Sequence, residues 1–183
     1  MELKHAVDSV LEEGHRQASF TVKPVTTQAD LNATILLFEA YAASLGIDLT
    51  FQDFANEMTS MPGKYASPAG TLLLAESPAG AIGCVGLRPF GSHGHCEMKR
   101  LYVDPKGRGL GVGKALATAV INEAKRLGYK AICLDTLPTM SSARALYESL
   151  GFRETEPYYN TPLEGTVFLE LPLVQVANNT ART

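Results

Sequence analysis

The 183-residue sequence contains no tryptophan and only three cysteines, and charges, glycines or prolines interrupt all of its apolar stretches. A membrane-spanning helix needs about 20 consecutive apolar residues, so we expect a soluble protein without a membrane partner. Neither charge sign dominates, because 16 Lys and Arg stand against 19 Asp and Glu, for a formal net charge of -3. This balance argues against a dedicated nucleic-acid binder.

The cysteines, Cys84, Cys96 and Cys133, are odd in number and form no CxxC pair. They predict reduced core thiols rather than disulfides, a redox motif or a metal site. His93 and His95 stand two residues apart without a third ligand, so we predict no metal. The first residues mix both charge signs without a signal-peptide pattern, and we therefore expect a cytoplasmic location.

The length fits one domain that spans residues 1–183. Apolar residues at helical spacing predict a helix over about residues 2–13, within an N-terminal extension of residues 1–17. The polar residues 174–183 predict a flexible tail. Thr27 or Asp30 is expected to open a helix over residues 28–44, and Thr50 with Asp53 resembles a capping box for a short helix.

Strand and helix patterns alternate along the remaining sequence. Strands are predicted at residues 19–25, 71–76, 81–87, 95–103, 130–136 and 166–173, and later helices from the glycine-rich segment to residue 127 and over residues 139–150. The strands pair as hairpins first and alternate with helices later. This order predicts an α/β (α+β) fold with a mixed, mostly antiparallel central sheet flanked by helices.

The strongest functional signal is the run Arg108-Gly109-Leu110-Gly111-Val112-Gly113, which joins a strand to a helix. Glycines let backbone N–H groups approach an anion, and a helix N-terminus carries about half a positive charge. Residues 95–130 also hold eight Lys and Arg against three Asp and Glu. The segment therefore predicts a site for a phosphate-bearing ligand.

The spacing of this run distinguishes between phosphate-binding motifs. The P-loop pattern G-x-x-x-x-G-K-[ST] fails, because Arg108 stands where the first glycine belongs and Ala115 follows Lys114. The dinucleotide pattern G-x-G-x-x-G fails at Lys114, which occupies the place of its third glycine. The pattern R/Q-x-x-G-x-G/A fits residues 108–113. Here the sequence resembles the GNAT superfamily of acyl-CoA-dependent N-acetyltransferases.

Two further features carry the same resemblance. Glu97 lies eleven residues before Arg108, where histone-type members of this superfamily have their general base. Residues 143–152 are similar to the family segment A-x-x-L-Y-x-x-x-G-F and include Tyr147. The resemblance implies acetyl transfer from acetyl-CoA (coenzyme A) to the primary amine of a small or amino-acid-like acceptor, without metal or a covalent enzyme intermediate. It also implies that the domain forms a homodimer in some members.

The resemblance assigns a role to each site residue. Glu97 is the expected base, acting directly or through water, the Leu101 N–H the oxyanion donor, and Tyr147 the acid for the departing thiolate. A chain that only binds acyl-CoA as a regulatory module, or one that acetylates proteins or peptides, stays an alternative. The residues expected to contact coenzyme A are Leu101, Tyr102, Val103, Arg108, Gly109, Leu110, Gly111, Val112, Gly113, Lys114 and Ser142.

Each assignment has a structural alternative. Glu97 fits a strand-edge glutamate paired with Lys99 or Arg100, Tyr147 fits a tyrosine packed on the sheet, and Ser142 fits a helix cap. Arg108 and Lys114 fit solvated cations. By alternation, Cys96 is expected on the opposite face of its strand from Glu97, and Leu101 and Val103 on the same face as Glu97 and Lys99.

The acceptor site is expected among residues 38–54, 88–95 and 158–164. Arg88 with Arg100 fits a receptor for a carboxylate, or two unrelated surface arginines. His93 or His95 is an alternative base, because imidazole titrates near neutral pH. Tyr158 with Tyr159 fits an aromatic lid or a packed loop.

Overall fold

The computed structural model of this chain describes residues 19–91 and 94–173. The predicted N-terminal helix, the predicted tail at residues 174–183, and His93 lie outside these described residues. Their predictions are therefore neither confirmed nor contradicted.

Strands and helices follow one another in the predicted order. The strands are β1 (Thr21–Pro24), β2 (Thr71–Ser77), β3 (Gly80–Phe90), β4 (His95–Val103), β5 (Ala131–Thr136), β6 (Arg153–Glu154) and β7 (Val167–Pro172). The helices are α1 (Gln28–Leu45), α2 (Phe54–Thr59), α3 (Val112–Arg126) and α4 (Ser141–Ser149), with 3-10 turns η1 (Thr50–Gln52), η2 (Gly63–Tyr65) and η3 (Pro105–Gly107). The sequence did not predict β6, because two residues are too few for an alternating pattern.

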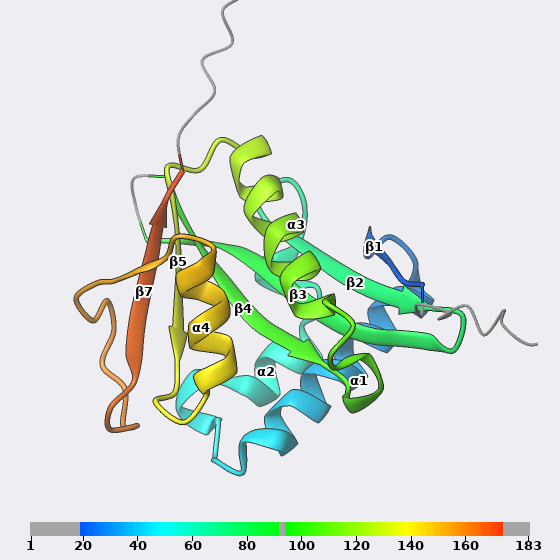
Figure 1. The fold of residues 1–183 in the computed structure, drawn as a ribbon, viewed down its shortest axis with the longest axis horizontal. Coiled ribbons are helices and arrows are strands. Elements are labelled where there is room, and N and C mark those ends of the chain that lie inside the picture. The colour runs from blue at the N-terminus through cyan, green and yellow to red at the C-terminus, as the bar shows by residue number, and fades with distance from the viewer. Residues whose placement is uncertain (1–18, 92–93, 174–183) are drawn as a thin grey trace, which may run out of the picture.

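The strands form one seven-stranded sheet in the order β1-β2-β3-β4-β5-β7-β6. All neighbours are antiparallel except β4 and β5, which are parallel. One face packs on α3 and α4 around Leu116, Val120 and Phe152, and the other packs on α1 around Phe38 and Leu74 (Figure 1). The predicted mixed, mostly antiparallel sheet flanked by helices is confirmed.

Capping explains where α1 begins, and it corrects one prediction. Thr27 and Asp30 act together, since each side chain accepts a hydrogen bond from the backbone N–H of the other. The capping box predicted for Thr50 and Asp53 is wrong. Asp53 adopts a left-handed conformation with a φ of 57° and makes no side-chain cap, while the Thr50 N–H donates to Asp48 in a 3-10 turn.

A β-bulge interrupts β4 at Arg100, which has a positive φ of 57°. The register between β4 and β3 shifts by one residue at this point. An extra residue reverses the alternation of side chains between the two faces of a strand. Met98 therefore packs in the core beneath α3 before the bulge, and Leu101 and Val103 pack there after it.

The bulge makes one predicted grouping wrong. Leu101 and Val103 do not share a face with Glu97 and Lys99, because alternation stops at the bulge. Cys96 precedes the bulge and belongs to the core beneath α3. Its predicted position on the face opposite Glu97 is confirmed.

β4 and β5 pair over a short distance and then separate. Their register covers only His95 to Glu97 against Ala131 to Cys133. Beyond Glu97, the edge of β4 that faces β5 has no strand partner within the described ranges. Such an edge offers backbone N–H and C=O groups to a ligand that aligns like an added strand.

Gly86 tests how closely the α1 face of the sheet is packed. A Cβ atom at Gly86 would lie 2.6 Å from the ring of Tyr65, which is 3% exposed. We expect Gly86→Ala to lower the free energy of unfolding by about 1–3 kcal/mol in urea denaturation, as overpacking does elsewhere. Gly113→Ala is the control, because its nearest neighbour lies 3.6 Å away and alanine favours a helix. Unchanged stability of Gly86→Ala would contradict this packing.

Candidate active site

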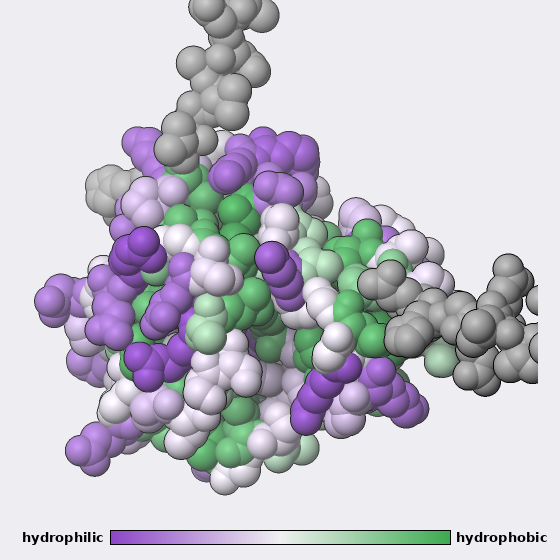
Figure 2. Space-filling view, in the orientation of Figure 1, coloured by the Kyte–Doolittle hydropathy of each residue, from purple (hydrophilic) through white to green (hydrophobic). Residues whose placement is uncertain are grey.

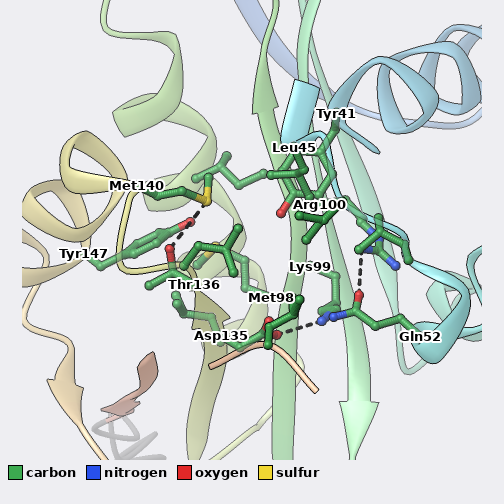
Figure 3. Close-up of a pocket in the computed structure, with 16 residues that line it drawn as sticks. Tyr41, Leu45, Gln52, Met98, Lys99, Arg100, Asp135, Thr136, Met140 and Tyr147 are labelled. Atoms are coloured by element: carbon green, nitrogen blue, oxygen red, sulfur yellow. Dashed lines mark hydrogen bonds and ion pairs between the residues drawn. The ribbon is translucent and has the colours of Figure 1, made fainter. Parts of the chain in front are cut away.

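A cleft opens where β4 and β5 separate (Figure 3). The residues after Glu97 on β4 and after Cys133 on β5 line it, together with α1, α4 and the segment before β7. Two of the three segments predicted around the acceptor, residues 38–54 and 158–164, contribute lining residues, whereas residues 88–95 contribute none. The lining residues with groups relevant to the chemistry are Tyr41, Gln52, Lys99, Leu101, Asp135 and Tyr147.

Leu101 and Tyr147 meet in this cleft, although they come from a strand and a distant helix. Tyr147 is 7% exposed and also packs against Phe152, with 5.7 Å between ring centroids. Burial raises the pKa of Tyr147 above its usual range, and the nearby Tyr41 and Asp135 raise it further. Tyr147 therefore keeps its proton at neutral pH and is a hydrogen-bond donor.

The glycine-rich segment between η3 and α3 is exposed. Gly109 and Gly111 have φ values of 76° and 80°, which residues with a side chain rarely adopt. No atom lies within 4 Å of the position that a Cβ would take at either glycine. No side chain caps α3, so the first N–H groups of this helix are left to a ligand or water. The open space and the donors fit a diphosphate.

The space-filling view shows the face of the sheet that α3 and α4 cover. A hollow lies there between α4 and the segment before α3, and its floor is hydrophobic (Figure 2). Its apolar floor follows from the bulge, because Leu101 and Val103 pack toward this face. A long ligand can therefore reach from the glycine-rich segment along β4 to Tyr147.

The basic residues of positions 95–130 separate into groups. Lys106, Arg108 and Lys114 are exposed around the glycine-rich segment. Lys99 and Arg100 are buried on β4, and the others lie at or beyond the C-terminal end of α3. Only the first group is placed to interact with a bound anion.

The serines at the start of α4 do not cap it. The N-cap is Met140, which makes no side-chain hydrogen bond, and the helix begins at Ser141. The capping alternative for Ser142 is therefore wrong. Its side chain is exposed, and its contact with coenzyme A stays a prediction.

Glu97 is 1% exposed and has partners for both carboxylate oxygens. Oε2 accepts hydrogen bonds from Arg88 Nε at 2.8 Å and Nη2 at 2.7 Å. Oε1 accepts one from the Tyr158 hydroxyl at 3.2 Å and lies 3.6 Å from Lys99 Nζ. Glu97 thus lies on a central strand, paired with Lys99 but not with Arg100. It does not line the cleft, and its role as base stays a prediction.

Asp135 is a cleft residue that sequence reasoning missed. Its Oδ1 lies 2.7 Å from Lys99 Nζ (Figure 3). Because the same Nζ lies 3.6 Å from Glu97 Oε1, Lys99 stands between the two carboxylates. Ile132 and Leu134 pack in the core beneath α3 and α4, so alternation puts Asp135 on the other face of β5. The signal in the sequence is this single charge inside an apolar strand.

Arg100 on β4 forms hydrogen bonds with η1 and an ion pair with α2. Its Nε and Nη2 donate to the two oxygens of Glu57 at 3.2 and 2.7 Å, and its Nη1 donates to Gln52 at 2.8 Å. Its guanidinium also lies 5.0 Å from the Phe54 ring centroid. Arg88 and Arg100 are thus neither free to receive a carboxylate together nor surface residues, because each is largely buried against a carboxylate of its own.

The electrostatics of Glu57 reflect this contact with Arg100. Burial alone would raise the pKa of Glu57, but the hydrogen bonds and the charge of Arg100 outweigh it and hold the pKa below its usual value. The ion pair therefore stays charged at neutral pH.

Tyr158 and Tyr159 belong to a packed aromatic cluster with Phe90 and Phe168. Ring centroids in this cluster lie 4.7 to 5.6 Å apart. The packed-loop interpretation is confirmed, and a role of this loop as a lid over the acceptor stays a prediction. His95 lies at the end of β4 away from the bulge, 3.8 Å from a carboxylate of β7, and does not line the cleft.

The three cysteines are free and buried, as predicted. Burial, with a contribution from Glu170, raises the pKa of Cys133 to about 12, so its thiol stays protonated.

Over residues 19–91 and 94–173, no helix combines the length and apolar character needed to cross a membrane. No cluster of three or more His, Cys, Asp or Glu side chains suited to a metal occurs over the same residues.

Comparison with known proteins agrees with this geometry. The sequence model of the acetyltransferase (GNAT) family matches residues 37–152. An uncharacterized N-acetyltransferase of Schizosaccharomyces pombe is 40% identical over 159 residues, which cover 86% of this chain and 98% of the relative. N-acetylaspartate synthetase of Danio rerio is 33% identical over 145 residues, 73% of this chain and 51% of the relative.

A solved structure has the same fold. YncA of Salmonella typhimurium, in a structure with its cofactor acetyl-CoA, superimposes with a TM-score of 0.62 over 90% of this chain and 99% of that chain. Its sequence identity is 20%, so the likeness concerns the fold alone.

Gly111 and Gly128 provide a matched test of the glycine-rich segment. Both have a positive φ, 80° and 82°, and open space around a Cβ, but they lie at opposite ends of α3. We expect Gly111→Ala to raise the dissociation constant of coenzyme A by about 10- to 100-fold, because one lost charge-assisted hydrogen bond costs about 1.5–3 kcal/mol. Gly128→Ala should lose similar stability without weakening binding in calorimetry. Equal dissociation constants for the two variants would contradict this site.

Proposed function

Since the chain belongs to the acetyltransferase (GNAT) family of N-acetyltransferases, we propose that it transfers the acetyl group of acetyl-CoA to the primary amine of a small, amino-acid-like acceptor by direct attack. The observation that carries this proposal is the separation of β4 and β5 beyond Glu97. It opens a cleft that contains Leu101 and Tyr147, and the exposed glycine-rich segment follows β4 and η3 in the chain. No nucleophilic side chain is required.

Different segments of the chain bind different parts of coenzyme A. The backbone N–H groups of residues 108–113 hold the diphosphate, with Arg108 and Lys114 adding positive charge. The free edge of β4 at residues 101–103, including Tyr102, pairs with the pantetheine arm as if it were an added strand. The exposed side chain of Ser142 contacts the same arm. Acetyl-CoA supplies the thioester carbonyl that the amine attacks.

Leu101 and Tyr147 act on the two charges that develop during transfer. The Leu101 N–H donates to the carbonyl oxygen as it gains negative charge. The Tyr147 hydroxyl donates a hydrogen bond to the departing thiolate. A thiol has a pKa of about 8.5, well below that of buried Tyr147, so Tyr147 stabilises the thiolate rather than giving up its own proton. This refines the acid role predicted from the sequence.

The acceptor amine must lose a proton before it attacks, because it is protonated at pH 7. The family resemblance assigns this step to Glu97, directly or through water. What supports a carboxylate here is a continuous chain of contacts from Glu97 through Lys99 to Asp135 in the cleft.

The polar lining of the cleft favours an amino-acid-like acceptor. The cleft is partly open, and its cavity volume is about 40 Å³. Its polar groups include both a cation, Lys99, and an anion, Asp135, which suits an amino acid better than an apolar amine. The relative from Danio rerio is named for the synthesis of an N-acetylated amino acid, and this name supports the same acceptor class.

Thiol release from acetyl-CoA tests the proposed function. The purified chain is incubated with acetyl-CoA and, separately, with amino acids, simple alkylamines and a basic peptide, and free coenzyme A is measured with a thiol reagent. We expect an amino acid or a small amine to give the highest rate. Tight binding of acetyl-CoA without release by any amine would identify a regulatory module, and preference for the peptide would contradict a small acceptor.

Tyr147→Phe tests the role of the hydroxyl. We expect turnover to fall by about 10- to 100-fold at every pH from about 6 to 9, because the tyrosine stays protonated over this range and a lost hydrogen bond to a charged group costs about 1.5–3 kcal/mol. Coenzyme A affinity should change little. Tyr129→Phe is the control, because the Tyr129 hydroxyl donates to Ala69 at a site that does not line the cleft. A loss in Tyr147→Phe that appeared only at high pH would contradict hydrogen bonding by a neutral tyrosine.

A further inference from the structure

Two carboxylates lie on the strands that form the cleft, and only one of them reaches it. Asp135 is the one carboxylate among the described residues that line the cleft. Glu97 is 1% exposed, and Arg88 and Tyr158 occupy its oxygens. A general base must lie within hydrogen-bond reach of the proton that it removes. The position of Asp135 in the cleft therefore favours Asp135 over Glu97 as the general base.

Asp135 has capacity for an acceptor amine. A carboxylate accepts about four hydrogen bonds; Lys99 supplies one of them to Asp135 at 2.7 Å, and the Tyr159 hydroxyl supplies another. The side chain of Asp135 is 15% exposed, against 2% for Glu97. An ammonium group that enters the cleft can thus donate to Asp135 without breaking the contact with Lys99.

The surroundings of Asp135 disfavour an acceptor that stays protonated in the cleft. Two positive charges, Lys99 and Arg100, line the same cleft, and a third positive charge is unfavourable beside them. Charged and titratable groups near Asp135 come from every element packed around it: Lys99, Glu97 and Arg100 on β4, Tyr41 on α1, Tyr147 on α4, and Tyr158 and Tyr159 before β7. Burial raises the pKa of each of these four tyrosines, so they stay neutral.

Lys99 links Glu97 to the cleft, which Glu97 itself does not line. The Lys99 ammonium is 7% exposed and lies between two carboxylates, 2.7 Å from Asp135 and 3.6 Å from Glu97. Arg88 in turn fixes Glu97 through two hydrogen bonds to one oxygen. This chain of contacts sets the position of Lys99 and, through it, that of Asp135.

We propose that Asp135 contacts the acceptor amine and receives its proton, and that Glu97 is a positioning residue that acts through Lys99. This inference rests on the proposed function. An ammonium proton passes to the Asp135 carboxylate, the nitrogen lone pair forms the C–N bond, and the C–S bond breaks. A second proton leaves the nitrogen and ends on the thiolate, giving the amide and free thiol. Asp135 then returns its proton to water.

Asp135→Asn tests the proton transfer through a pH profile. An alkylamine has a pKa of about 10, so its neutral fraction rises about tenfold per pH unit below that value. Without a base, the variant depends on this neutral fraction. With the best amine from the panel, we expect kcat/KM to fall by about 10²–10⁴ at pH 7 and to recover about tenfold per unit toward pH 9. The wild-type profile should be flatter, and coenzyme A affinity should not change.

Three further variants separate the roles. Glu97→Gln should lower kcat at all pH values with a profile parallel to that of the wild type. Asp135→Glu keeps a carboxylate and should restore the flat profile even if its rate is low. Glu170→Gln is the control, because Glu170 lies one strand away beside His95 and Cys133 and should change neither rate nor profile.

The opposite pattern overturns the inference. A profile of Asp135→Asn parallel to the wild type would show a structural role only. If Glu97→Gln became steeply pH-dependent while Asp135→Asn did not, Glu97 would be the base, and the proposed function would stand. A wild-type chain that releases no coenzyme A with any amine would overturn both.

Discussion

The bulge at Arg100 is the constraint on which the site depends. A positive φ at a residue with a side chain costs roughly 1–2 kcal/mol, so other contacts must compensate. Arg100 has them, since its buried guanidinium binds Glu57 and Gln52, and breaking a buried ion pair typically costs about 3–5 kcal/mol. Because the bulge reverses the faces of β4, the strand presents Lys99 to one side of the sheet and Leu101 to the other. Charged side chains therefore line the cleft from one face of the sheet, and apolar side chains line it from the other face.

The charges around the cleft balance. Three cations and three anions lie in contact along β3, β4, β5 and α2, and each has a partner of opposite sign: Arg88 with Glu97, Lys99 with Asp135, and Arg100 with Glu57. Burial of isolated charges would be costly, but paired charges are tolerated. In the proposed reaction, an acceptor that arrives as an ammonium ion adds one positive charge to this network, and the balance returns only when its proton has passed through a carboxylate to water. The same network thus stabilises the strands and prepares the chemistry.

Local patterns allowed much of this to be predicted from the sequence. The glycine run 108–113 and Tyr147 depend on neighbours close in sequence, and the alternation of strands and helices indicated the sheet. The ion pairs could not be predicted, because Lys99 finds Asp135 36 residues away and Arg100 finds Glu57 43 residues away. The bulge was equally hidden, since an arginine gives no sign of a left-handed backbone. For that reason, simple alternation along β4 predicts the wrong face for Leu101 and Val103.

The proposed function requires the free edge of β4 beyond Glu97 and the glycine-rich segment to bind one molecule of acetyl-CoA together. Amide hydrogen exchange measured with and without acetyl-CoA tests this directly. We expect slower exchange at residues 99–103 and at residues 108–114, with no change at residues 62–72 beneath α1. Protection confined to residues 62–72, or none along β4, would contradict it.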